Sequence, residues 1–171
     1  VLLSRGDDLV GILNGLDVAS WDPRFDTALP AAFSADSIEG KWTCKRELQQ
    51  PLGLRVDASI PLFGIDSRVD PQKGIDLIEH VAPGLIERGA QLVLLGSGRK
   101  GMLDPLHGLA RIWKESVSIN ELFDESLARR IYAGSDFFLM PSRFEPCGLG
   151  QLVALRYGAI PVVRRTGGLA D

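Results

Sequence analysis

The stretch DFFLMPSRFEPCGLGQLVALRY, residues 136–157, decides the fold of this chain. Its apolar run Phe137–Met140 is typical of a buried strand, and Gly150–Tyr157 has the pattern of a helix. The turn between them carries Glu145, a proline and glycines. In an open α/β sheet, ligands bind at such a strand-to-helix turn, because the first N–H groups of the helix lack partners and attract anions. The turn is therefore predicted to bind an anionic ligand beside the Glu145 carboxylate.

Strand and helix patterns alternate along the chain from residue 60 onward. Each predicted strand is a continuous apolar run, as expected for parallel strands that are buried on both faces. The predicted strands cover residues 60–65, 91–95, 116–119, 137–140 and 160–163, and the predicted helices cover residues 72–88, 102–113, 125–133 and 150–157. This alternation predicts an α/β fold, with right-handed βαβ units in a doubly wound, Rossmann-like parallel sheet.

Residues 1–58 are predicted to lead into this sheet domain, which takes up residues 59–171. The apolar run Leu9–Leu13 predicts an interdomain strand. An irregular connector follows over residues 17–40. Its aromatic side chains need burial, so the connector is expected to be ordered; these are Trp21, Phe25 and Phe33.

A helix is predicted over residues 37–50, just before the sheet domain. Ile38, Trp42 and Leu48 recur at about one helical turn or a multiple of it, which is typical of a helix. Pro51 ends the helix.

The composition is that of a globular protein. Of the 171 residues, 45% are hydrophobic and 24% are charged, and the net charge is −3. A negative net charge argues against nucleic acid as a partner, and no apolar stretch reaches the roughly 18 residues of a membrane span. The chain has only two histidines and no C-x-x-C motif, which argues against a structural zinc site.

A glycine-rich turn follows the second predicted strand. Gly96–Gly101 reads GSGRKG, which matches the dinucleotide fingerprint, and Glu121 lies 20 residues beyond Gly101. This favours an NAD-type oxidoreductase as one interpretation. The fingerprint belongs in the first βα turn, however, and here a βα unit precedes it. The alternative is a turn in which glycines let the backbone approach another ligand, or none.

Other strand ends carry residues suited to a nucleotide. Arg68 and Lys73 flank the first strand-to-helix turn, where cations either hold phosphates or point into solvent. Phe123 follows the third strand and could stack on a base or belong to the core. Thr166–Gly168, after the last strand, could bind an anion or form a plain turn. Because the carboxyl ends of these strands share one edge of the sheet, we expect the groups to lie together.

Taken together, these motifs resemble the bacterial glycogen synthase and plant starch synthase family, which are retaining glycosyltransferases of the two-domain GT-B type. The resemblance runs nearly end to end. The matching stretches are GILNGLD (residues 11–17) with WDP (21–23), SRVDPQKG (67–74), YAGSD (132–136) through PSRFEPCGL (141–149), and RRTGGLAD (164–171).

The resemblance implies transfer of glucose from a nucleotide sugar, commonly ADP-glucose, to the non-reducing end of an α-1,4-glucan. It implies retention of the anomeric configuration, with no catalytic metal and no other cofactor. Arg68 and Lys73 match the cations on the donor diphosphate, and Glu145 matches the glutamate at the donor sugar; these three are the expected catalytic residues. Phe123 matches the aromatic residue beside the adenine.

The same resemblance assigns the rest of the donor-binding set. The turn around sugar and phosphate comprises Cys147, Gly148 and Leu149. Gly150 stands where the family often has a threonine that touches phosphate, so one hydroxyl contact is expected to be lost. The glycine-rich turn with Gly96 and Gly98 completes the donor-binding residues.

The resemblance also implies partners and a location. The chain corresponds to the C-terminal, donor-binding half of a GT-B enzyme, truncated at its C-terminus, and an N-terminal domain would bind the glucan acceptor. The expected location is the cytoplasm of a bacterium, or the plastid stroma of a plant. ADP-glucose and UDP-glucose stay alternative donors, and a non-catalytic nucleotide-binding module stays an alternative to an enzyme.

Overall fold

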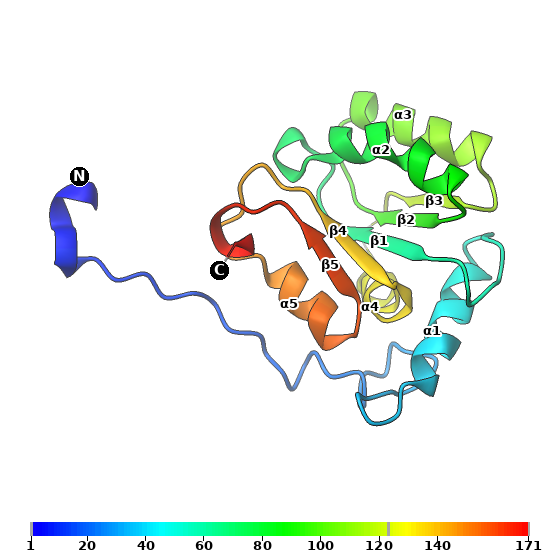
Figure 1. Ribbon diagram of the computed structural model, residues 1–171, viewed down its shortest axis with the longest axis horizontal. Coiled ribbons are helices and arrows are strands. Elements are labelled where there is room, and N and C mark those ends of the chain that lie inside the picture. Colours follow the sequence, from blue (N-terminus) through cyan, green and yellow to red (C-terminus); the bar gives the residue numbers. More distant parts are fainter. Residues whose placement is uncertain (1, 123, 171) are drawn as a thin grey trace.

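The computed structural model describes residues 2–122 and 124–170, and its centre is one parallel sheet (Figure 1). The strand order is β3-β2-β1-β4-β5, and every neighbouring pair is parallel. The strands are β1 (Leu62–Asp66), β2 (Gln91–Leu95), β3 (Val117–Asn120), β4 (Phe137–Met140) and β5 (Ile160–Val163). The predicted doubly wound sheet is therefore confirmed.

Helices cover both faces of the sheet (Figure 1). Two of them, α2 and α3, lie on one face, and α1, α4 and α5 lie on the other, each group over its own hydrophobic core. No helix in the described part of the chain is long and apolar enough to cross a membrane. The helices are α1 (Glu39–Gln49), α2 (Ile75–Glu87), α3 (Lys100–Ile112), α4 (Glu125–Gly134) and α5 (Leu149–Arg156).

The direction of winding reverses between β1 and β4. From β1 the chain passes through α2 and α3 to β2 and β3, and then crosses back through α4 to place β4 on the other side of β1. In open α/β sheets, the carboxyl ends of two such strands diverge into a crevice where ligands bind. The fold therefore places a candidate site beyond Asp66 and Met140.

The amino ends of the same two strands are held by one carboxylate. Asp136 Oδ2 accepts hydrogen bonds from the Leu62 backbone N–H at 2.8 Å and from Lys45 Nζ at 2.6 Å. Lys45 also donates to the carbonyl oxygens of Ala58 and Ile60. One partly buried ion pair thus joins α1, β1 and β4.

Helix α2 begins later than the sequence pattern predicts. Residues Pro71–Lys73 form one 3₁₀ turn, in which the Asp70 carboxylate accepts from the Lys73 N–H at 3.1 Å. Gly74 then adopts φ 70°, a left-handed conformation that favours glycine, and α2 starts at Ile75. The turn keeps Lys73 at the edge of the sheet, outside the regular helix.

The helix predicted over residues 37–50 is confirmed as α1, but its apolar residues do not mark its buried face. Leu48 is buried, whereas Ile38 and Trp42 are 41% and 49% exposed. Apolar spacing could not reveal the true face, because most of its members are polar or charged. The buried residues of α1 are Lys41, Cys44, Lys45, Leu48 and Gln49.

Lys41 shows how a lysine can occupy a core position. Its Nζ donates to the carbonyl oxygens of Ala133, Ser135 and Tyr157, each at 2.9 Å. Burial lowers the pKa of Lys41 to about 8. Because this value is still above neutral pH, the side chain stays an ammonium there and can donate all three hydrogen bonds. Lys41 thereby ties α1 to the carboxyl ends of α4 and α5.

The amino-terminal prediction is wrong in part. Residues 9–17 form no strand, and Leu9–Leu13 pair with none of the described strands. An isolated strand has no partner for its backbone groups, so the apolar run alone could not form one. In the connector, Phe33 is buried and Trp21 packs against the core, but Phe25 is 74% exposed. The division at residue 58 stays a prediction.

Candidate functional site

A cleft of about 530 Å³ opens at the carboxyl ends of β1 and β4. It is the crevice that the reversal of the winding creates. Most of the residues predicted for the site line it. These are Arg68, Lys73, Gly96, Glu145, Cys147, Gly148, Leu149 and Gly150. Phe123 lies outside the described residues, and Gly98 does not line the cleft but packs against Val69.

An ion pair spans the cleft. Lys73 Nζ lies 2.7 Å from Glu145 Oε2, and the two side chains are only 18% and 12% exposed. Lys73 comes from the turn before α2, whereas Glu145 comes from the turn after β4. The pair therefore joins the two strand ends that the fold brings side by side.

Arg68 stands at the mouth of the cleft. Its side chain is 70% exposed, and its guanidinium nitrogens lie 3.4 Å from Asp70 Oδ2 and 3.2 Å from Gln72 Oε1. These contacts leave the side chain free to turn, because exposed pairs of this kind contribute little stability. Arg68 can reach an anion that enters beside Lys73.

The cleft also receives the amino end of α5. Gly148 precedes the helix with φ 81°, and a Cβ at this position would lie 2.6 Å from Leu169 Cδ2. Leu149 and Gly150 form the first turn and line the cleft. The first N–H groups of a helix have no partner inside it and carry partial positive charge, so this end of the cleft favours an anion.

Two glycines after β5 support the Glu145 turn. The Gly168 N–H donates to the Glu145 carbonyl at 2.9 Å, and Gln151 Nε2 donates to the Gly168 carbonyl at 2.9 Å. A Cβ at Gly167 would lie 2.2 Å from the Glu145 carbonyl oxygen, and one at Gly168 would lie 2.4 Å from the Cys147 carbonyl oxygen. Of the two roles predicted for Thr166–Gly168, the structure favours the plain turn, because the Gly168 N–H is already used.

The glycine-rich turn after β2 packs against the turn after β1. A Cβ at Gly96 would lie 1.9 Å from the Ser67 carbonyl oxygen, and one at Gly98 would lie 2.2 Å from the Val69 carbonyl oxygen. Val69 also donates to the Ser97 carbonyl at 2.8 Å. These contacts explain the glycines without a dinucleotide.

The acidic residue of the fingerprint has another partner. Glu121 contacts His107 through its carboxylate. The turn itself follows β2, which is the second strand of the chain rather than the first. Both observations disfavour the NAD-type interpretation, since that motif needs the first βα turn and an acid free to bind a ribose.

A family model described as "Glycosyl transferases group 1" matches residues 61–171. The chain belongs to this family. The matched range begins just before β1 and includes every strand and every lining residue of the cleft except Asn14.

Relatives of this group 1 glycosyltransferase are named glycogen synthases. The glycogen synthase of Syntrophotalea carbinolica and glycogen synthase 2 of Geobacter metallireducens are each 52% identical over all 171 residues. The chain covers 35% of each, so it spans about a third of the length of the curated relatives it matches. The resemblance to this family, inferred from the motifs, is confirmed.

A solved structure agrees with the sequence relatives. The catalytic domain of starch synthase IV from Arabidopsis thaliana, bound to ADP and acarbose, matches with a TM-score of 0.93 and 42% identity. The match covers 99% of this chain and 35% of that chain. The fold is thus the Rossmann-like α/β fold of GT-B glycosyltransferases.

Asp66 and Tyr132 are two of the lining residues of the cleft that were not predicted from the sequence. Asp66 is the last residue of β1, and burial raises the pKa of its carboxyl. Asp66 could have been predicted as a site residue, because it is an acidic residue at the end of an otherwise apolar strand. Tyr132 lies on α4 and is 5% exposed, and its sequence context gives no signal, because buried tyrosines are common in cores.

No metal centre is formed by the side chains of residues 2–122 and 124–170. None of their histidine, cysteine, aspartate and glutamate side chains gather in groups of three or more that could hold an ion. The charged groups of the cleft are Arg68, Lys73, Asp66 and Glu145.

The support of the Glu145 turn predicts a large effect of a small substitution. Gly168→Ala places its Cβ against the Cys147 backbone, and we expect a loss of about 1–3 kcal/mol in the free energy of unfolding, as for an overpacked core. Gly101→Ala is the matched control, because it lies in α3 with nothing within 4 Å and should stabilise by up to about 1 kcal/mol. Urea denaturation measures both, and equal stabilities for Gly168→Ala and the unsubstituted chain would refute the contact.

Proposed function

We propose that this chain is the donor-binding part of a glucan synthase, which transfers glucose from ADP-glucose to the non-reducing end of an α-1,4-glucan with retention. The observation that carries the proposal is the Lys73–Glu145 pair at 2.7 Å, set opposite the amino end of α5 in the cleft. Support comes from relatives named glycogen synthase and from the similar starch synthase IV domain that was solved with ADP.

The proposed chemistry follows the charges of the cleft. As the bond to glucose breaks, negative charge develops on the departing ADP. Lys73 and Arg68, together with the amino end of α5, stabilise that charge because they are placed before the reaction begins. Incoming phosphate competes with Glu145 for Lys73, which frees the Glu145 carboxylate to face the donor sugar. The proposal requires no catalytic metal and no other cofactor.

The acceptor needs a second domain. The chain spans about a third of its glycogen synthase relatives, and we infer that an N-terminal domain closes over the cleft and holds the α-glucan. The relatives with this name come from bacteria, which supports a cytoplasmic location, as expected for an enzyme that uses a cytoplasmic nucleotide sugar.

ADP binding tests the donor site. Lys73→Ala removes a cation from the phosphate side of the cleft, so we expect ADP affinity to fall about tenfold or more, since hydrogen bonds to charged groups contribute roughly 1.5–3 kcal/mol. Isothermal titration calorimetry on the chain measures this. Lys114→Ala, an exposed lysine outside the cleft, is the control. Equal affinity for both variants, or preferential binding of NADH, would contradict the proposal.

Turnover tests the role of Glu145. In a complete synthase that contains this chain, Glu145→Gln keeps the size of the side chain but removes its charge. We expect kcat to fall by at least about a hundredfold while ADP affinity stays equal or rises, because the carboxylate acts on the sugar and competes for Lys73. Glucose incorporation measures kcat. An unchanged kcat would remove Glu145 from the mechanism, and a donor that binds without any transfer in the unsubstituted protein would favour the non-catalytic module.

A further inference from the structure

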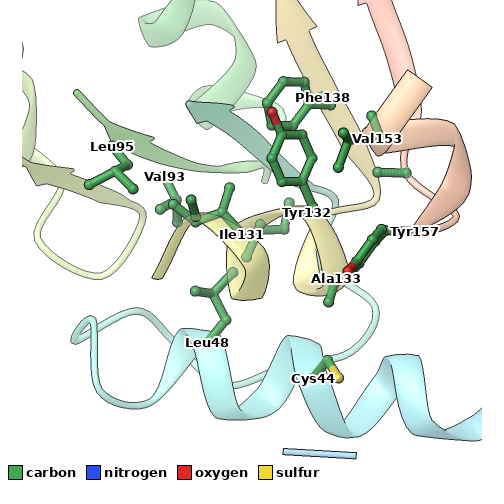
Figure 2. Close-up of a cluster of buried hydrophobic side chains, with 14 of the residues drawn as sticks. Cys44, Leu48, Val93, Leu95, Ile131, Tyr132, Ala133, Phe138, Val153 and Tyr157 are labelled. Carbon is green, nitrogen blue, oxygen red and sulfur yellow. The ribbon is translucent and has the colours of Figure 1, made fainter. Parts of the chain in front are cut away.

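Tyr132 is held rigidly beneath the cleft. Its ring stacks on Phe138 of β4, with the ring centroids 4.4 Å apart. It also contacts Trp21 in a T-shaped arrangement and Tyr157 in a tilted one. Figure 2 shows the side chain rising from α4 between Phe138 and Val153, with its hydroxyl pointing away from α1. Packing on three sides fixes the position of this hydroxyl within narrow limits.

The hydroxyl of Tyr132 has no hydrogen-bond partner among residues 2–122 and 124–170, although the residue as a whole is only 5% exposed. The hydroxyl oxygen itself is not buried, because among the described residues only Ser135 Oγ is a buried side-chain polar atom without a partner. The Tyr132 hydroxyl therefore reaches the surface that lines the cleft. Burial and the neighbouring Asp66 raise the pKa of Tyr132, so the hydroxyl keeps its proton. It is a fixed donor that opens onto the cleft.

Gly150 leaves this hydroxyl accessible. A Cβ at residue 150 would lie 3.3 Å from the Tyr132 hydroxyl and 3.2 Å from both Met140 Sδ and Met140 Cε. Any larger residue would therefore crowd the hydroxyl or cover it. The first turn of α5 and the tyrosine hydroxyl consequently meet at one point of the cleft wall.

We propose that Tyr132 is a donor-binding residue, whose hydroxyl donates a hydrogen bond to the diphosphate of the nucleotide sugar at the amino end of α5. The assignment rests on the proposed function and deepens it. The loss of one hydroxyl was expected at Gly150, and Tyr132 supplies a hydroxyl beside that same position. The small residue at 150 and the tyrosine at 132 act as a pair.

Asp66 defines the competing interpretation. It lines the same cleft and lies close enough to Tyr132 to raise the pKa of the phenol. If the hydroxyl served only to neutralise Asp66, its removal would change stability and leave phosphate binding alone. The experiment therefore has to read out the phosphate and the fold separately.

Calorimetry with ADP and adenosine tests the assignment on the whole chain. Tyr132→Phe keeps the ring and should weaken ADP binding about tenfold, as expected for a hydrogen bond to a charged group, while adenosine binding stays unchanged. Tyr157→Phe is the matched control, because that hydroxyl bonds to Asp26 outside the cleft at 2.5 Å. It should leave ADP affinity unchanged, and thermal unfolding of both variants shows that each is folded.

A double-mutant cycle isolates the pair. Gly150→Ala should weaken ADP binding in the unsubstituted chain, and weaken it clearly less when Tyr132→Phe has already removed the hydroxyl. Additive effects of the two substitutions would overturn the role of Tyr132. Unchanged ADP affinity in Tyr132→Phe would do the same, provided that the unsubstituted chain binds ADP. Either result would leave the proposed donor site in place. Absence of ADP binding by the unsubstituted chain would overturn both proposals.

Discussion

The ion pair between Asp136 and the buried Lys45 joins α1 to the two central strands of the sheet. The two side chains are 24% and 3% exposed, and Asp136 also accepts the first backbone N–H of β1. Removing Asp136 would leave the buried Lys45 ammonium without its carboxylate partner, which destabilises a protein because the charge stays uncompensated. This contact joins β1 to β4 at their amino ends, and the crevice at their carboxyl ends is lined by Arg68, Lys73 and Glu145.

Backbone packing builds the walls of the cleft, and side chains supply its charge. Gly96 and Gly168 each lie against a carbonyl oxygen of a neighbouring turn, at distances that no side chain could share. The turns are therefore fixed relative to one another before a ligand arrives. Lys73 and Glu145 project from these turns and neutralise one another in the free protein. The turns hold the cleft in one shape, and a diphosphate can replace Glu145 as the partner of Lys73. Both properties suit a site that must bind a diphosphate, stabilise its developing charge and release it.

The sequence predicts the sheet well and the buried polar groups poorly. The strands were predictable because parallel strands buried on both faces read as apolar runs, and the reversal of the winding then placed Arg68 and Glu145 at one edge. The buried face of α1 was not predictable, since Lys41 is accommodated by three carbonyl oxygens from distant residues. Tyr132 was missed for the same reason, because its access to the cleft depends on Gly150 in another helix.

The central claim is that the crevice between β1 and β4 binds the donor diphosphate. An ADP titration of the ¹⁵N-labelled chain, followed by amide chemical shifts, tests it most directly. We expect shifts concentrated in the turns at residues 67–73, 96–98 and 147–151. Shifts centred instead on the groove between the connector and α5, which is lined by Pro23 and Leu155, would contradict the account, as would no shifts at millimolar ADP.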